Sequence, residues 1–285
     1  MFKTIYLENS DGDRLDFSLA GPFTISDIQG LDPPAATINT SEVALQDGAR
    51  FNSSKLNPRT INLAFAIQGD AARSRVKVFK VLKSKQYIKL VYQGQERDVF
   101  IDGYIEDINI SYFAKKQIVT VVIVCPDPYF KAAAERSDTL SAIYSDFHFP
   151  FQSEATPEIV FGHIETTSGV SITNDGDVAC GLIIELSAKG AVTNPAIFNY
   201  ITAERFGITY ALQAGDLVTI DTRQGHKGAT LLRGGVTTNI FNYIDQGSAW
   251  LQLAPNGSTF VYTVDSGTVT DLTVTFKHID LYEGV

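Results

Sequence analysis

Short runs of alternating apolar and polar residues recur along the whole chain, and this period of two constrains the fold most strongly. Successive side chains of a strand point to opposite faces, so such runs are typical of strands with one buried face. Gly, Asn, Asp or Pro separates the runs, as in the turns of antiparallel sheets. The sequence therefore predicts a mainly β protein. The predicted strands are TIYLEN (4–9), RTINLAFAI (59–67), YIKLVYQ (87–93), FIDGYIEDINISYF (100–113), QIVTVVIVC (117–125), CGLIIELS (180–187), DLVTIDT (216–222) and DLTVTFKHIDLY (271–282).

One segment, at about residues 70–84, has the pattern of an amphipathic helix. Asp70 is placed to cap its first turn, and Ala72, Val76 and Phe79 recur on one face. The segment is rich in cations and contains no acidic residue after its cap. These cations are Arg73, Arg75, Lys77, Lys80 and Lys83. They form either a solvated outer face or an interface with an acidic neighbour or a nucleic acid.

The stretch VVIVCPDPYFK (121–131) starts as a strand and then breaks at two prolines. Neither Pro126 nor Pro128 can donate a ladder hydrogen bond, so the strand should stop there. Cys125 beside a carboxylate also suggests a nucleophile, but no histidine lies nearby in the sequence to activate it. We interpret the stretch as the end of a domain and expect both cysteines of the chain to be free and buried.

The length of 285 residues allows two domains of ordinary size. Residues 1–140 carry 17 basic and 17 acidic side chains, whereas residues 141–285 carry 6 and 15. The stretch KAAAERSDTLSAIYSDFHFP (131–150), which spans the change in charge balance, lacks a clear two-residue period. We therefore predict a first domain at 1–135, a connector at 136–152 and a second domain at 153–285. The chain has no basic excess for general nucleic-acid binding, and it has neither a membrane span nor a signal peptide, so we expect a soluble protein made in a cytoplasm.

Motifs of catalysis or metal binding are missing from the sequence. The four histidines are scattered, and no nucleophile elbow, phosphate-binding loop or dinucleotide fingerprint occurs. NSDGDRLDF (9–17) and TNDGD (173–177) lack the ligand spacing of a calcium loop, and we interpret both as hairpin turns. A pair of acidic residues acting on glycosides remains open, because spacing rules do not reveal it. We expect no enzymatic activity, no cofactor and no metal.

Two aromatic residues of the second half, Trp250 and Tyr262, are candidates for a sugar-binding platform. The alternating pattern around Trp250 also suits a buried strand face, shared with Leu253 and Phe260. Core packing and glycan contact therefore remain as alternatives for Trp250.

Six stretches, in this order and at these spacings, resemble the distal tail protein (Dit) family of tailed phages with long noncontractile tails. They are GPFTISDIQGLDPP (21–34), LQDGARFNSSKLNPRTINLAFAI (45–67), VTVVIVCPDPYFK (119–131), AGDLVTIDTRQGHKGATLL (214–232), TNIFNYIDQGSAWLQLAPNGSTFVYT (238–263) and KHIDLYEGV (277–285). The resemblance covers most of both halves.

The resemblance implies an N-terminal domain, sandwich-like or barrel-like in its β structure, with one helix and an extended hairpin. Six copies would form a ring, and the helix cations are our candidates for its interface. It also implies a C-terminal jelly roll similar to galectins and carbohydrate-binding modules. The ring would lie at the distal end of the tail in the virion and would join the tail-tube protein to a tail-tip or baseplate protein, with phage DNA passing through its channel. A module that binds host cell-wall glycan for adsorption is the alternative function.

Overall fold

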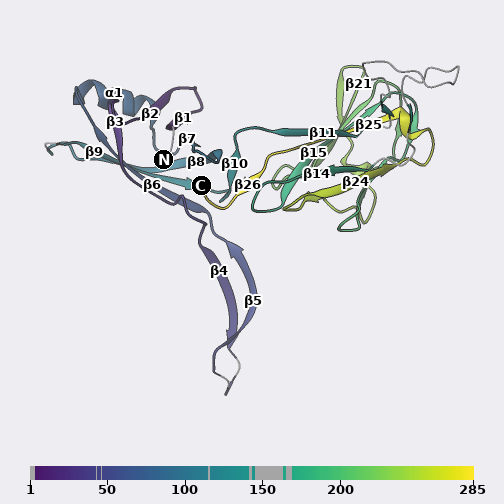
Figure 1. The fold of residues 1–285 in the computed structure, drawn as a ribbon, viewed down its shortest axis with the longest axis horizontal. Coiled ribbons are helices and arrows are strands. Elements are labelled where there is room, and N and C mark those ends of the chain that lie inside the picture. The colour runs from purple at the N-terminus through teal and green to yellow at the C-terminus, as the bar shows by residue number, and fades with distance from the viewer. Residues whose placement is uncertain are drawn as a thin grey trace, which may run out of the picture. The chain divides into compact units, whose positions relative to one another are not determined.

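The computed structural model describes residues 4–42, 44–45, 47–114, 116–140, 143–144, 163–164 and 169–285. The chain divides into two compact units, the first made of residues 1–133 with 281–285 and the second of residues 134–280 (Figure 1). Within the described ranges, no helix has the length and apolar character needed to cross a membrane. Strands dominate both units, so the predicted fold class is confirmed.

The first unit is built on a nine-stranded antiparallel sheet with the order β2-β1-β7-β8-β9-β6-β3, and β10 and β26 are attached to it. Its edge strands β2 and β3 share no ladder, so the sheet is open rather than barrel-like. Its elements are β1 (Thr4–Asn9), β2 (Arg14–Phe17), β3 (Phe23–Gln29), β4 (Ala36–Glu42), β5 (Ala49–Leu56), β6 (Arg59–Ile67), α1 (Ala71–Val81), β7 (Tyr87–Gln93), β8 (Asp98–Ile110), β9 (Ile118–Cys125), β10 (Phe130–Ala132) and β26 (Leu281–Tyr282).

The alternation predicted from the sequence matches the observed burial of these strands. In β6, Ile61, Leu63 and Phe65 are buried on one face, while Thr60 and Asn62 are exposed on the other. Phe65 packs against Phe17 and Phe23, with ring centroids 5.0 and 5.7 Å away. Burial of this apolar face is the main stabilising contribution to the unit.

The turn between β1 and β2 is a hairpin turn, as predicted, because the two strands pair directly. Asn9 Oδ1 accepts hydrogen bonds from the backbone N–H groups of Asp11 and Asp13, and Gly12 has a φ of 80°. The polar residues that could suggest a calcium loop therefore stabilise a tight turn.

The second unit contains two main sheets. A seven-stranded sheet has the order β11-β25-β15-β20-β21-β22 with β23 attached to β15, and a four-stranded sheet has the order β14-β24-β17-β18. Its elements are β11 (Arg136–Leu140), β12 (Ile143–Tyr144), β13 (His163–Ile164), β14 (Val170–Ile172), β15 (Cys180–Ala188), β16 (Val192–Thr193), β17 (Ala196–Asn199), β18 (Glu204–Gly207), β19 (Ala211–Leu212), β20 (Leu217–Asp221), β21 (Gly228–Arg233), β22 (Val236–Asn239), η1 (Phe241–Tyr243), β23 (Gln252–Leu253), β24 (Ser258–Thr263), η2 (Val269–Asp271) and β25 (Leu272–His278).

The core of the second unit lies between these two sheets. Phe260 of β24 and Phe276 of β25 are both fully buried and stack with a centroid distance of 4.9 Å, which joins the sheets as in a jelly-roll sandwich. The prediction of a hairpin at 173–177 is wrong. The flanking strands β14 and β15 do not pair with each other. β14 pairs with β24, and β15 pairs with β20, β23 and β25, all of which are distant in sequence from the turn.

The structure differs from the expected domain boundaries at two places. Residues 136–140 of the expected connector form β11, which pairs with β25, while residues 141–142 and 145–152 lie outside the described residues. The predicted strand 271–282 ends at His278, and the chain then returns to the first unit, where β26 pairs with β10. Both boundaries are set by pairing between strands far apart in sequence, β11 with β25 and β10 with β26. The local alternation of apolar and polar residues does not indicate which strands will pair.

Candidate functional site

Helix α1 begins as predicted, because Asp70 accepts hydrogen bonds from the backbone N–H groups of Ala72 and Arg73, both at 3.1 Å. It ends at Val81 rather than near residue 84. The expected apolar face is not the buried one. Val76 is 70% exposed and Phe79 is 45% exposed, whereas Val78 and Val81 are buried. The helix therefore has a second apolar stripe, which contacts the sheet.

The five candidate interface cations differ in their surroundings. Arg75 is half-buried and donates to Gln117 Oε1 at 2.7 Å, and Lys80 pairs with Asp13 at 2.7 Å. The other three, Arg73, Lys77 and Lys83, are exposed. Cationic side chains thus border the exposed stripe of Ala72, Val76 and Phe79, and this surface has the mixed apolar and charged character of a protein interface.

The β4–β5 hairpin is the most exposed element of the first unit (Figure 1). The two strands pair only with each other, and nearly all their side chains are exposed. Ile38 is 56% and Phe51 is 61% exposed. Because an isolated two-stranded hairpin is marginally stable in water, this one is expected to be stabilised by a partner.

The base of the hairpin is held by a buried cation, Arg59, for which the sequence pattern gives no signal. Arg59 starts β6 on the same face as its apolar residues and is 3% exposed. Its guanidinium donates to the carbonyls of Gly30 and Asp32, at 2.6 and 2.5 Å, on the segment that leads into β4. It also donates to Pro128 O at 2.7 Å and Glu283 O at 2.6 Å. Desolvation lowers the pKa of Arg59 from its ordinary value.

The contacts of Arg59 complete the explanation of the CPDP stretch. Strand β9 ends at Cys125, as the prolines predict, and the Pro128 carbonyl turns inward to Arg59. Phe130, which follows, is fully buried with its ring centroid 4.6 Å from the guanidinium carbon. The CPDP stretch therefore has a structural role: it ends strand β9 and supplies a carbonyl to Arg59.

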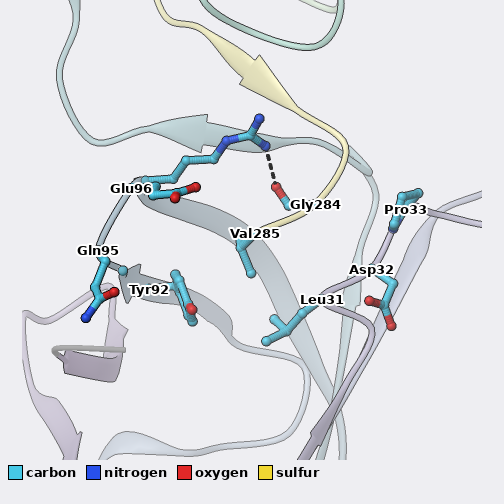
Figure 2. A pocket seen from close by; sticks show the side chains of 10 residues that line it. Leu31, Asp32, Pro33, Tyr92, Gln95, Glu96, Gly284 and Val285 are labelled. Atoms are coloured by element: carbon cyan, nitrogen blue, oxygen red, sulfur yellow. Dashed lines mark hydrogen bonds between the residues drawn. The ribbon is translucent and has the colours of Figure 1, made fainter. Parts of the chain in front are cut away.

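A depression of about 390 Å³ lies beside this region in the first unit (Figure 2). Leu31, Tyr92 and Val285 line its apolar part, and Arg97 donates to Gly284 O at 3.1 Å on one wall. The Arg97 hydrogen bond fixes the C-terminal segment beside the β7–β8 turn.

Neither cysteine has the surroundings of a reactive thiol. Both are free and buried, as predicted, and burial raises the pKa of Cys125 and of Cys180 to about 12. Since the thiolate is the nucleophilic form, neither is activated at neutral pH. Among the residues that the structure describes, no three His, Cys, Asp or Glu side chains are grouped where they could share a metal ion. The absence of catalysis, cofactor and metal stays a prediction.

The two glycan candidates are placed differently by the fold. Tyr262 is 8% exposed, and its hydroxyl donates to Leu272 O at 3.0 Å, so it belongs to the core and cannot serve as a sugar platform. Trp250 is half-buried, outside any strand, with ring centroids of Phe206 and Phe241 at 5.3 and 6.0 Å. Burial of Tyr262 follows from its inward position on β24, two residues after Phe260.

The second unit also contains a nearly buried carboxylate that should make its stability depend on pH. Asp216 is 2% exposed and accepts two hydrogen bonds from Arg233, at 2.8 and 2.5 Å, and one from Gln213 N at 2.7 Å. The Arg233 hydrogen bonds lower the pKa of Asp216. A group with a lowered folded-state pKa stabilises the fold above its unfolded pKa and loses that contribution as the pH falls.

We therefore expect Asp216→Asn to lower the free energy of unfolding at pH 7 and to have a much smaller effect as the pH falls below about 4. Urea unfolding of both proteins at several pH values measures the difference. Arg233→Gln should show the same convergence, because it removes the partner. If the difference in unfolding free energy between variant and wild type stays constant across this pH range, the Asp216–Arg233 pair does not make stability depend on pH.

Comparison with protein families gives two matches. Residues 10–125 match the phage tail protein RIFT-related domain, and residues 175–279 match the C-terminal domain of the siphovirus-type tail component. Together the matched segments make up more than half of the chain. Comparison with curated proteins gives no match.

Solved structures with the same fold include proteins of two phages. The Dit protein of phage SPP1, described as a hub of the adsorption apparatus in phages that infect Gram-positive bacteria, is 15% identical with a TM-score of 0.68, and the match covers 97% of this chain and 99% of that one. A chain of the activated phage P2 baseplate with Ca is 12% identical with a TM-score of 0.53, and both chains are covered completely. The corresponding baseplate with Sr gives 13% identity, a TM-score of 0.53 and 99% coverage of both chains. With both family models matched in order and the fold of both units accounted for, this chain belongs to the distal tail protein (Dit) family of siphophages, structural components of the phage tail.

Proposed function

We propose that this chain forms a hexameric ring that joins the tail-tube protein to a tail-tip or baseplate protein and leaves a channel for DNA. Its place in the virion is the distal end of the tail. In this role it is a structural adaptor without catalytic activity, and DNA passes through without sequence-specific binding. Its balanced numbers of basic and acidic side chains in residues 1–140 suit contacts between identical neighbours.

The observation that carries the proposal is the exposed β4–β5 hairpin. Its free edges and its apolar residues Ile38 and Phe51 would favour aggregation in a monomer, and a closed ring can cover them in every copy. The exposed stripe of α1, bordered by Arg73, Lys77 and Lys83, is the second candidate contact between neighbours.

Replacing Ile38 and Phe51 together by Asp should abolish assembly, because charges would have to be buried at the contact. Both side chains are exposed in the single chain, so the thermal stability of the chain should remain close to that of the wild type. Sedimentation of the chain co-expressed with the tail-tube and tip proteins of the same genome measures assembly. Leu19→Asp, at a position that is 75% exposed outside the hairpin, is the control and should assemble.

Electron microscopy of intact tails tests the ring directly. We expect six copies of this chain in one ring at the distal end. A trimeric spike, or a location on the capsid, would refute the adaptor role. Normal incorporation of the Asp double variant would show that the hairpin is not an interface.

A further inference from the structure

A second depression, of about 610 Å³, lies entirely within the second unit, whereas the surfaces proposed above for contacts in the ring belong to the first unit. It is lined by two segments, the end of β18 with the residues after it and the stretch from η1 onward. The lining residues are Arg205, Thr209, Asn242, Tyr243, Ile244, Asp245 and Gln246.

Backbone hydrogen bonds hold the two segments together. Thr209 N donates to Tyr243 O at 2.8 Å, Asp245 N donates to Gly207 O at 3.0 Å, and Ile208 and Ile244 form a β-bridge. Because backbone pairing fixes both walls, the side chains above them are presented on a preformed surface, which limits the entropy lost on binding.

The charged groups of this depression neutralise each other. Arg205 Nη1 donates to Asp245 Oδ2 at 2.7 Å, and the Thr209 hydroxyl donates to Asp245 Oδ1. These hydrogen bonds lower the pKa of Asp245, so the pair stays ionised at neutral pH. Asn242 and Gln246, both exposed, add amide donors and acceptors at the rim. The surface therefore favours a ligand with many neutral hydrogen-bonding groups over an anion or a cation.

Aromatic rings are exposed beside these polar groups. Tyr243 is 48% exposed, and its ring is fixed by an edge-on contact with Tyr210, at a centroid distance of 4.8 Å and an angle of 82°. Phe241, on the same short helix η1, is 47% exposed and lies 6.0 Å from the ring of Trp250. A rigid, half-exposed ring next to planar polar side chains matches a sugar, which has an apolar C–H face and a rim of hydroxyls.

We propose that this depression binds a neutral oligosaccharide, with a sugar ring against Tyr243 and hydroxyls hydrogen-bonded to Arg205, Asp245 and the Asn242 and Gln246 amides. The site differs from the sequence-based candidates, since Tyr262 is in the core and Trp250, which packs beside Phe241, is not one of the lining residues. It does not depend on ring formation, because every group belongs to one copy of the chain.

The test uses the full chain and an array of neutral oligosaccharides built from hexoses and N-acetylhexosamines, followed by titration of the ligands that bind. Trp250 is the only tryptophan of the chain, so its fluorescence reports on the adjacent Phe241 and η1. Tyr243→Ala should weaken binding by about tenfold or more, whereas Tyr243→Phe, which keeps the ring, should stay within about twofold.

Gln246→Ala changes an exposed side chain only and should weaken binding without altering the melting temperature. Tyr200→Ala, at a 79% exposed aromatic of the same unit outside the depression, is the matched control and should bind normally. The proposal is overturned if no neutral oligosaccharide binds at millimolar concentration, or if Tyr243→Ala and Gln246→Ala bind like the wild type. Binding only to a tail protein would identify the patch as a protein interface and would equally overturn it.

Discussion

Replacement of Arg59 by Met should destabilise the first unit by about 3–5 kcal/mol, the range for removing one partner from a buried polar network. Methionine fills a similar volume but has no donors. The change therefore leaves the buried carbonyls of Gly30, Asp32, Pro128 and Glu283 without their hydrogen bonds. Arg59→Lys should recover only part of the loss, because an ammonium group cannot reproduce the planar fork of a guanidinium.

Chemical denaturation measures the loss, and hydrogen exchange locates it. Amides of β10 and β26, on the two sides of the Arg59 network, should lose protection first. Arg14→Met is the control, because Arg14 forms an exposed pair with Asp16 and should contribute at most about 1 kcal/mol. Equal effects of the two substitutions would show that the Arg59 network does not hold these segments.

Replacement of Phe276 by Ala should destabilise the second unit by about 3–5 kcal/mol. Phe276 is fully buried and stacks on Phe260, so truncation removes apolar burial from both main sheets and leaves a cavity between them. Phe276→Leu should cost clearly less, since it fills most of that space.

Denaturant unfolding combined with hydrogen exchange of β15 and β24 checks this prediction. Tyr200→Ala provides the surface comparison and should change stability by about 0.5 kcal/mol or less. A loss of 1 kcal/mol or less for Phe276→Ala, on the order of a surface effect, would mean that the two sheets are not held by this contact.

Local pattern was sufficient for most strands and for the start of the helix. β1, β6 and β7 have the predicted bounds because alternation places every second side chain in the core, and Asp70 caps α1 because its carboxylate reaches two free N–H groups. The prolines after Cys125 likewise end β9, since they cannot donate to a ladder.

The face of the helix shows where this reasoning fails. α1 carries two apolar stripes, one with Val76 and Phe79 and one with Val78 and Val81, and both fit a helical period. Only packing on the sheet decides which one is buried. The exposed stripe then becomes a candidate for contact with another copy, and the sequence contains no signal for this distinction.

The residues that line the depression of the second unit could be identified only from the fold. The sequence marks residues 238–263 only through a family resemblance, whereas the depression requires Arg205 and Asp245, 40 residues apart, to lie side by side. Tyr243 and Trp250 follow one another closely, and only the fold distinguishes the half-exposed ring at the depression from the one that packs beside Phe206.

The sequence by itself determined the β class, the bounds of β1, β6 and β7, the helix cap and the end of β9, because each follows from contacts between near neighbours or from backbone chemistry. Tertiary structure alone decided the return of β26 to the first unit, the network of Arg59 with Glu283, 224 residues away, and the burial of Tyr262. These features arise when distant segments compete for the same hydrogen-bonding edges and the same core volume. A local period of two specifies the faces of a strand but not its neighbours.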